Sequence, residues 1–229
     1  MHIIKTICLL LLALPHLQVS STSRHKGQKE VFIALFTGAT GSSATGVPAI
    51  ADQLRTTFNA IVRVYGYSET GQAKKDIEQR IGQTGNEQVI LIGHSYGGNA
   101  VLEFVKEHGN SYKYYEYKRE EGERPNVRGW EILIDYAITI DPYGSNDKLS
   151  WNVPGYNFYT TYGETVSGRL VHGKNIAGKY MENKDYTNLI HSCSQGQNHR
   201  YTHTNIDDCE GIITAIIEKV RARITGWPF

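Results

Sequence analysis

The chain has little cysteine and no bias of charge. It contains three cysteines in 229 residues, and its 24 lysines and arginines nearly balance its 23 aspartates and glutamates. Proteins that bind nucleic acid carry a clear excess of positive charge, so this balance argues against a nucleic-acid partner. The cysteines also lack the Cys-x-x-Cys spacing of a structural zinc site. No metal ion or organic cofactor is therefore expected.

Long hydrophobic runs are also scarce. One apolar run follows Lys5 and covers residues 7–14, which is too short to cross a bilayer. Such a run, preceded by a positive charge and followed by small residues at Val19 and Ser21, is typical of a secretory signal peptide. We therefore predict a secreted or periplasmic protein with no stable membrane span. It would have a signal peptide over 1–21, a flexible lead-in over 22–30 and a single domain over 31–229.

Removal of the signal peptide would leave two cysteines, Cys193 and Cys209. Two cysteines in an exported protein usually pair, so a disulfide between them is predicted. Closing so short a loop would contribute about 3 kcal/mol to the free energy of unfolding in the chain-entropy model. The loop between them contains His199 and His203, and the bridge would restrain both histidines.

The body of the chain alternates apolar runs with helical patterns. This alternation predicts an α/β fold, with a mostly parallel central sheet and helices on both of its faces. Strands are expected over 31–36, 60–64, 88–92, 132–140 and 156–162, and helices over 47–58, 73–81, after residue 95 and over 209–224. A polar insertion interrupts the pattern near 109–129, and residues 163–200 show poor periodicity and are expected to form loops.

The most informative stretch is Gly93-His94-Ser95-Tyr96-Gly97, which lies between a buried strand and a helix. Glycines two residues before and after a serine allow a turn so sharp that any side chain there would collide with the strand or the helix. The turn would expose the Ser95 hydroxyl at the positive end of the following helix. It would also leave the backbone N–H of Tyr96 free to face a developing oxyanion.

This stretch resembles the nucleophile elbow of the α/β-hydrolase superfamily, in particular that of lipases and esterases. The resemblance is sharp around Ser95 and looser over the rest of the chain from Val31 onward. It implies that the loop after the first strand donates a second oxyanion N–H. Thr37-Gly38-Ala39 lies where many lipases have His-Gly-X, which makes Ala39 the matching donor, although Thr37 replaces the usual histidine.

Asp141 is the first candidate for the acid of a catalytic triad. It follows the strand over 132–140 and precedes Pro142, so it would lie at the carboxyl edge of the sheet, where parallel sheets carry their sites. The segment also resembles the Leu-Asp-Pro of some lipases. The commoner hydrolase layout places the acid one strand later, which leaves Glu164 as the alternative. Asp135 is less suitable because it precedes the end of the strand.

His203 is the first candidate for the base, because it lies on the loop before the last helix, and the order Ser, Asp, His matches the resembling superfamily. His199 is the second candidate, and His172 and His191 are more remote. Asp207 or Asp208 is expected to cap the final helix.

These residues predict a serine hydrolase that cleaves carboxylic esters of small molecules or lipids. Ser95, His203 and Asp141 would form the triad, and an acyl-enzyme would be the intermediate. An acyltransferase or a thioesterase would use the same residues. The other alternative is a secreted binding protein that keeps the hydrolase scaffold without catalysis.

Overall fold

The structure is a computed structural model that describes residues 30–39, 46–84, 87–111, 132–150, 153–166, 168–187, 190–192 and 198–226. The predicted signal peptide, most of the predicted insertion, and Cys193 lie outside these residues. The single-domain boundary, export and the disulfide therefore stay predictions. In the part of the chain that is described, no helix combines the length and the apolar content needed to cross a membrane.

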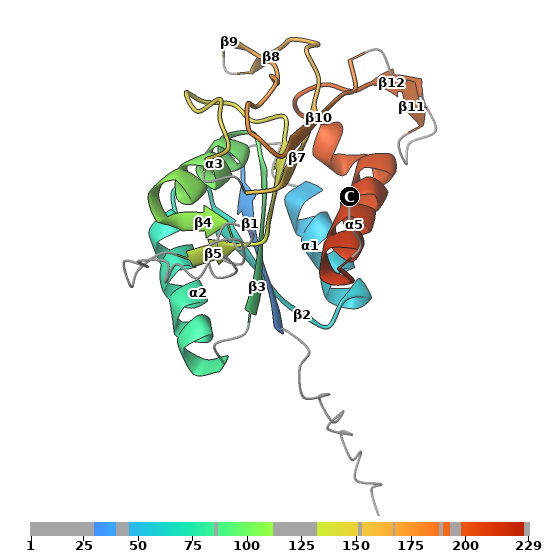
Figure 1. The fold of residues 1–229 in the computed structure, drawn as a ribbon. Helices are drawn as coiled ribbons and strands as arrows, with labels where there is room; N and C mark the ends of the chain where they lie inside the picture. Colours follow the sequence, from blue (N-terminus) through green and yellow to red (C-terminus); the bar gives the residue numbers. More distant parts are fainter. Residues whose placement is uncertain are drawn as a thin grey trace, which may run out of the picture.

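A six-stranded sheet in the order β10-β7-β6-β3-β1-β2 forms the centre of the molecule, and all of its strand pairs are parallel (Figure 1). Its strands are β1 (Glu30–Thr37), β2 (Ala60–Gly66), β3 (Glu87–His94), β6 (Tyr136–Ile140), β7 (Gly155–Tyr159) and β10 (Met181–Asp185). The helices are α1 (Gly46–Thr57), α2 (Thr70–Thr84), α3 (Tyr96–His108) and α5 (Glu210–Ile224). The predicted parallel sheet with helices on both faces is confirmed.

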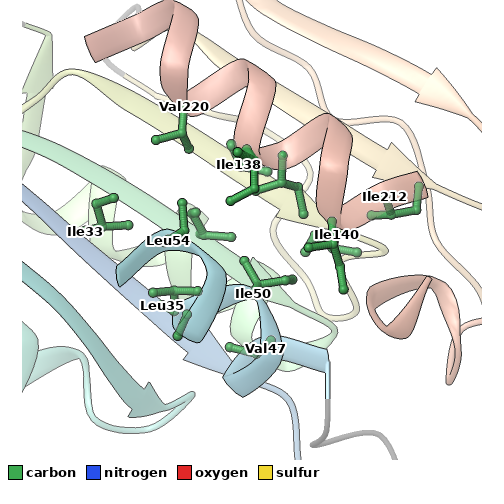
Figure 2. Close-up of a cluster of buried hydrophobic side chains, with 14 of the residues drawn as sticks. Ile33, Leu35, Val47, Ile50, Leu54, Ile138, Ile140, Ile212 and Val220 are labelled. Atoms are coloured by element: carbon green, nitrogen blue, oxygen red, sulfur yellow. The ribbon is translucent and has the colours of Figure 1, made fainter. Parts of the chain in front are cut away.

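Each face of the sheet carries its own hydrophobic core. Successive side chains of a strand point to opposite faces, so Ile33 and Leu35 of β1 pack in one core while Phe32 and Phe36 pack in the other. Helices α1 and α5 cover the first core, and α2 and α3 lie on the opposite side of the sheet (Figure 1). Figure 2 shows residues of α1 and α5 meeting the strand side chains in the first core. The two-sided burial explains why β1 has a continuous apolar sequence.

The predicted strand over 132–140 is in fact two strands. β5 (Ile132–Ile134) pairs with β4 (Gly109–Ser111) in a separate small sheet, whereas β6 enters the central sheet. Asp135 causes the interruption. Its carboxylate accepts a hydrogen bond from the N–H of Val89 at 2.9 Å, and its own N–H donates to the carbonyl of Val89 at 2.9 Å. A side chain thus takes over one bond of the strand ladder.

The predicted loop region over 163–200 contains strands, so that prediction is wrong in part. Four of them are short: β8 (Glu164–Val166), β9 (Arg169–Val171), β11 (Ile190–Ser192) and β12 (Asn198–Arg200) form two antiparallel pairs. The fifth, β10, pairs with β7 at the edge of the central sheet. Four of its five side chains are exposed, so its sequence lacks the apolar pattern on which strand prediction depends.

The predicted cap of the last helix is also wrong. Residues Ile206–Asp208 form a short 3-10 helix, η1, and Cys209 is the N-cap residue of α5, without a capping hydrogen bond from its side chain. The carboxylate of Asp207 does not cap α5, because it faces His94 at 3.1 Å in the interior.

Candidate active site

Ser95 lies in the one-residue turn between β3 and α3, at the carboxyl edge of the sheet. Its backbone is in the left-handed region with φ at 57°, which is unusual for a residue with a side chain. A Cβ on Gly97 would lie 2.1 Å from the carbonyl oxygen of Phe36, and one on Gly93 would lie 2.2 Å from that of Gly97. The two glycines are therefore required by close packing of strand, turn and helix, as their spacing around Ser95 predicted.

The structure brings His203 and Asp141 to Ser95 from distant parts of the chain. The Oγ of Ser95 lies 2.7 Å from Nε2 of His203, and Nδ1 of His203 lies 2.6 Å from Oδ2 of Asp141. A carboxylate only accepts hydrogen bonds, so Nδ1 of His203 carries a proton and donates a hydrogen bond to Asp141. Nε2 of the neutral ring is then the acceptor for the Ser95 hydroxyl. All three residues are buried.

Asp141 is held rigidly at the end of β6. Its backbone is also in the left-handed region, with φ at 44°, and its N–H donates to the carbonyl of Phe158. Its Oδ1 accepts a hydrogen bond from the N–H of Thr160 at 2.7 Å, which leaves Oδ2 for His203. Gly173 packs against the carboxylate, and a Cβ at that position would lie 1.8 Å from Oδ1. The carboxylate therefore has one orientation.

The alternative residues do not occupy these positions. Glu164 accepts hydrogen bonds from Thr204, through the N–H at 3.1 Å and Oγ1 at 2.8 Å, and so contacts the residue after His203. Asp135 is bonded to β3 instead. His172 is exposed, with Nδ1 2.9 Å from the carbonyl oxygen of Gly173. His191 and His199 are paired across β11 and β12, and their side chains lie outside the described part of the structure.

The two predicted oxyanion donors come from different elements. Tyr96 begins α3, and Ala39 follows Gly38 after β1. A Cβ on Gly38 would lie 3.1 Å from Cβ and 3.5 Å from Oγ of Ser95, so the loop after β1 comes into contact with the serine. The helices that follow β1 and β3 lie on opposite faces of the sheet (Figure 1), and α/β proteins generally bind ligands at such a change of direction.

A second histidine–carboxylate pair, His94 and Asp207, lies next to the pair of His203 and Asp141. The sequence patterns did not reveal it. His94 and Asp207 are both fully buried. Nε2 of His94 lies 2.8 Å from the carbonyl oxygen of His203, and Nδ1 lies 3.1 Å from Oδ2 of Asp207. The second contact has the distance of an ion pair but not the alignment of a good hydrogen bond. The two histidine rings lie 5.2 Å apart.

The pKa of His94 results from opposing effects. Burial, the largest effect, lowers the pKa of the imidazole because it penalises the charged form. The nearby carboxylate of Asp207, the carbonyl of His203 and the charge of Asp141 together outweigh burial and raise the pKa above its usual value. These surroundings therefore favour the charged form of His94 more than water favours it for a free imidazole.

Three tyrosines form a row of rings that leads away from the serine. The rings of Tyr67 and Tyr96 lie 5.4 Å apart, those of Tyr96 and Tyr143 lie 5.2 Å apart, and Tyr143 lies 6.1 Å from the ring of His203. Tyr67, at the far end, is 42% exposed. Aromatic rings beside a reactive group can support an apolar or planar part of a ligand.

Cys209 is buried, and its Sγ lies 3.0 Å from the carbonyl oxygen of Asn205. Within the described ranges, no three His, Cys, Asp or Glu side chains are grouped so that they could hold a metal ion.

Comparison with protein-family models and with curated proteins gives no match. Among solved structures, the chain is similar to a cutinase-like protein from Cryptococcus sp., with 12% identity, a TM-score of 0.51, and coverage of 86% of this chain and 97% of that one. The chain is also similar to an acetyl xylan esterase, with 13% identity, a TM-score of 0.42, and coverage of 86% of this chain and 99% of that one.

A hydrolase assigned to the α/β superfamily, from Xanthomonas campestris, has 10% identity, a TM-score of 0.46, and coverage of 85% of this chain and 99% of that one. The parallel six-stranded sheet, the sharp turn at Ser95 and the likeness to the cutinase-like protein lead to one conclusion: this chain has the α/β-hydrolase fold.

Proposed function

We propose that the protein is a serine hydrolase that cleaves carboxylic esters of small molecules through an acyl-enzyme. The observation that carries the proposal is the continuous chain of contacts from Ser95 Oγ to His203 Nε2 and from His203 Nδ1 to Asp141 Oδ2, at 2.7 Å and 2.6 Å. This is the geometry by which a serine hydroxyl becomes a nucleophile at neutral pH. The names of fold neighbours, a cutinase-like protein and an acetyl xylan esterase, agree with this class of reaction.

In the proposed mechanism, Ser95 Oγ attacks the acyl carbonyl while Nε2 of His203 takes the hydroxyl proton. Asp141 keeps the proton of His203 on Nδ1 and stabilises the imidazolium that forms. The backbone N–H groups of Tyr96 and Ala39 would hold the negative oxygen of the tetrahedral intermediate. His203 then protonates the leaving alcohol, and a water molecule activated by the same nitrogen releases the acid and regenerates Ser95.

The row formed by Tyr67, Tyr96 and Tyr143 would bind one side of the ester. Its members carry apolar ring faces and polar tips, which suits a small substrate with an apolar or planar group. A lipid ester, a thioester or an acyl acceptor other than water would engage the same three catalytic groups. Rates measured with each type of substrate would separate these reactions.

The proposal is tested by the hydrolysis of short p-nitrophenyl esters. The variants Ser95→Ala, His203→Ala and Asp141→Asn should each lower kcat by about 10⁴-fold or more. Asn tolerates the left-handed backbone of Asp141, so this variant should fold, but its amide would stabilise the wrong tautomer of His203. Ser145→Ala, His108→Ala and Asp147→Asn are the matched controls. Activity that survives in Ser95→Ala would contradict the proposal.

We also propose that residues 1–21 direct export and that Cys193 and Cys209 form a disulfide. The charge and apolar pattern of the N-terminus supports the first proposal, and the presence of two cysteines after the signal peptide supports the second. N-terminal sequencing of protein from an exporting host should then find Thr22 as the first residue. Mass spectrometry of the same unreduced protein should find Cys193 bound to Cys209. An uncleaved N-terminus and two free thiols would contradict these two proposals.

A further inference from the structure

The protonation of His94 follows from what its two ring nitrogens face. Nε2 lies 2.8 Å from the carbonyl oxygen of His203, which can only accept, so Nε2 carries a proton. Nδ1 lies 3.1 Å from a carboxylate oxygen of Asp207. A bare lone pair on Nδ1 would face the lone pairs of that oxygen, and both groups are fully buried. A second proton between them removes this repulsion, and the effects that raise the pKa of His94 favour the place of this proton on the imidazole.

The groups around the pair favour this charge distribution. Asp207 belongs to η1, and the start of α1 packs against it so closely that a Cβ on Gly46 would lie 2.5 Å from its carboxyl carbon. The positive end of the helix therefore faces the carboxylate. From the other side, Asp141 at the end of β6 adds a favourable charge to His94, while the ring of His203 lies 5.2 Å away. Ser95 follows His94 directly.

The bond from His94 to His203 matters because His203 lies in neither a helix nor a strand. In the loop before it, the carbonyl of Tyr201 accepts a hydrogen bond from the hydroxyl of Thr160. In the loop after it, the N–H of Thr204 donates a hydrogen bond to the carboxylate of Glu164. His94 holds the carbonyl of His203 itself. Since His94 is the residue before Ser95, this bond fixes the main chain of the base relative to the residue that precedes the nucleophile.

We propose that His94 and Asp207 are positioning residues, a buried pair with one shared proton that fixes His203 through its carbonyl oxygen. The role rests on the proposed function, because His203 needs positioning only if it serves as the base. Asp207 keeps the imidazole of His94 protonated and oriented, and His94 passes this orientation to His203. A displacement of His203 would lengthen its contact with Ser95 and lower the rate of proton transfer.

Two double variants separate positioning from stability. In His94→Leu/Asp207→Leu the donor to His203 and both buried charges are lost, and such replacements of buried ion pairs often leave the fold as stable or more stable. In His94→Gln/Asp207→Asn the charges are also lost, but the glutamine amide can still donate to the carbonyl of His203. Both are compared with the parent protein in p-nitrophenyl ester hydrolysis and in thermal unfolding.

We expect the leucine pair to lower kcat by about tenfold to a hundredfold, since misplacement of a catalytic group by about 1 Å has effects of this size. KM should change by less than about twofold, because the pair does not contact substrate. The Gln/Asn pair should lose less activity than the leucine pair, even where its Tm is lower. A leucine pair that folds and retains the kcat of the parent would overturn the positioning role.

The shared proton has a test that needs no measurement of activity. ¹⁵N spectra of histidine-labelled parent protein should show both ring nitrogens of His94 protonated at neutral pH, and Asp207→Asn should convert the ring to the neutral form with Nε2 protonated. His94→Gln assigns the signals. A neutral His94 in the parent would overturn the shared proton. If Ser95 proves inert, the proposed function fails and the positioning role fails with it, while these spectra still decide the state of the pair.

Discussion

Residues 30–108 and residues 132–226 contribute to the same site by different physical means. The first region supplies Ser95, whose position follows from packing of backbone against backbone at Gly93 and Gly97. The second region supplies Asp141 and His203. Their positions depend on the hydrogen bond that Thr160 donates to Asp141, on the contact of His94 with the carbonyl of His203, and on the bond that Thr204 donates to Glu164. The nucleophile is thus fixed by steric exclusion of backbone by backbone, which tolerates almost no change. Its partners are fixed mainly by polar contacts, which can be weakened by degrees, with close packing of Gly173 on Asp141.

This comparison predicts the largest effect at Gly97. In Gly97→Ala the new Cβ would lie 2.1 Å from the carbonyl oxygen of Phe36, and neither backbone can move without disrupting β1 or α3. We expect a loss of about 4 kcal/mol or more in the free energy of unfolding, or no folded protein. The control is Gly71→Ala in α2, where no atom lies within 4 Å of the added Cβ. That variant should gain about 0.5–1 kcal/mol, because alanine favours a helix. Urea unfolding measures both, and a stable Gly97→Ala protein would contradict the steric account.

A smaller effect is expected at Gly173, in the second region. The Cβ of Gly173→Ala would lie 1.8 Å from Oδ1 of Asp141 and 2.9 Å from Cβ of Tyr159, so the carboxylate must shift and its contacts with the N–H of Thr160 and with His203 must lengthen. We expect kcat to fall by about tenfold to a hundredfold while the fold is kept. Ester hydrolysis and circular dichroism measure the two quantities. Full activity in a folded variant would show that Asp141 does not need its present orientation.

Glu164 should have a weaker influence, since it contacts Thr204 rather than the ring of His203. Glu164→Gln keeps an acceptor for Thr204, and we expect kcat to stay within about threefold of the parent. Asp141→Asn, measured in the same assay, provides the contrast. If the loss in Glu164→Gln matched that of Asp141→Asn, Glu164 would be the acid and the assignment of Asp141 would be wrong.

The smallest effect concerns pH. The pKa of His94 is raised in the folded state, so its ion pair contributes stability that is fully present below the unfolded value of about 6.5 and is lost as the pH rises through the folded value. The difference in unfolding free energy between the parent and His94→Gln/Asp207→Asn should shift against the parent as the pH rises above about 6.5. Urea titrations across this range measure it. A difference independent of pH would show that the pair does not titrate.

The sequence predicted the first region well because its signals are local. The apolar runs of β1 and β3, and the glycines two residues on either side of Ser95, each identify their element without reference to distant residues. In the second region Asp141 and His203 could be selected from their places after a strand and before a helix. β10 was missed because an exposed edge strand has no apolar pattern to detect.

The pair of His94 and Asp207 could not be found in this way. The two residues are 113 positions apart, and only the fold brings their side chains within 3.1 Å. Asp207 had a plausible local role as a helix cap, and His94 lay inside a motif whose conspicuous members are Ser95 and the glycines. A histidine and an aspartate that both turn out to be fully buried are a signal only once burial is known.

The central claim, that Ser95 is an activated nucleophile, is tested most directly by a fluorophosphonate probe. Folded, purified protein is incubated with the probe, and the modified peptide is located by mass spectrometry. The account predicts one phosphonyl group, on Ser95, with labelling lost in Ser95→Ala and slowed in Asp141→Asn. Labelling at another serine, or equal labelling of the parent and Asp141→Asn, would contradict it.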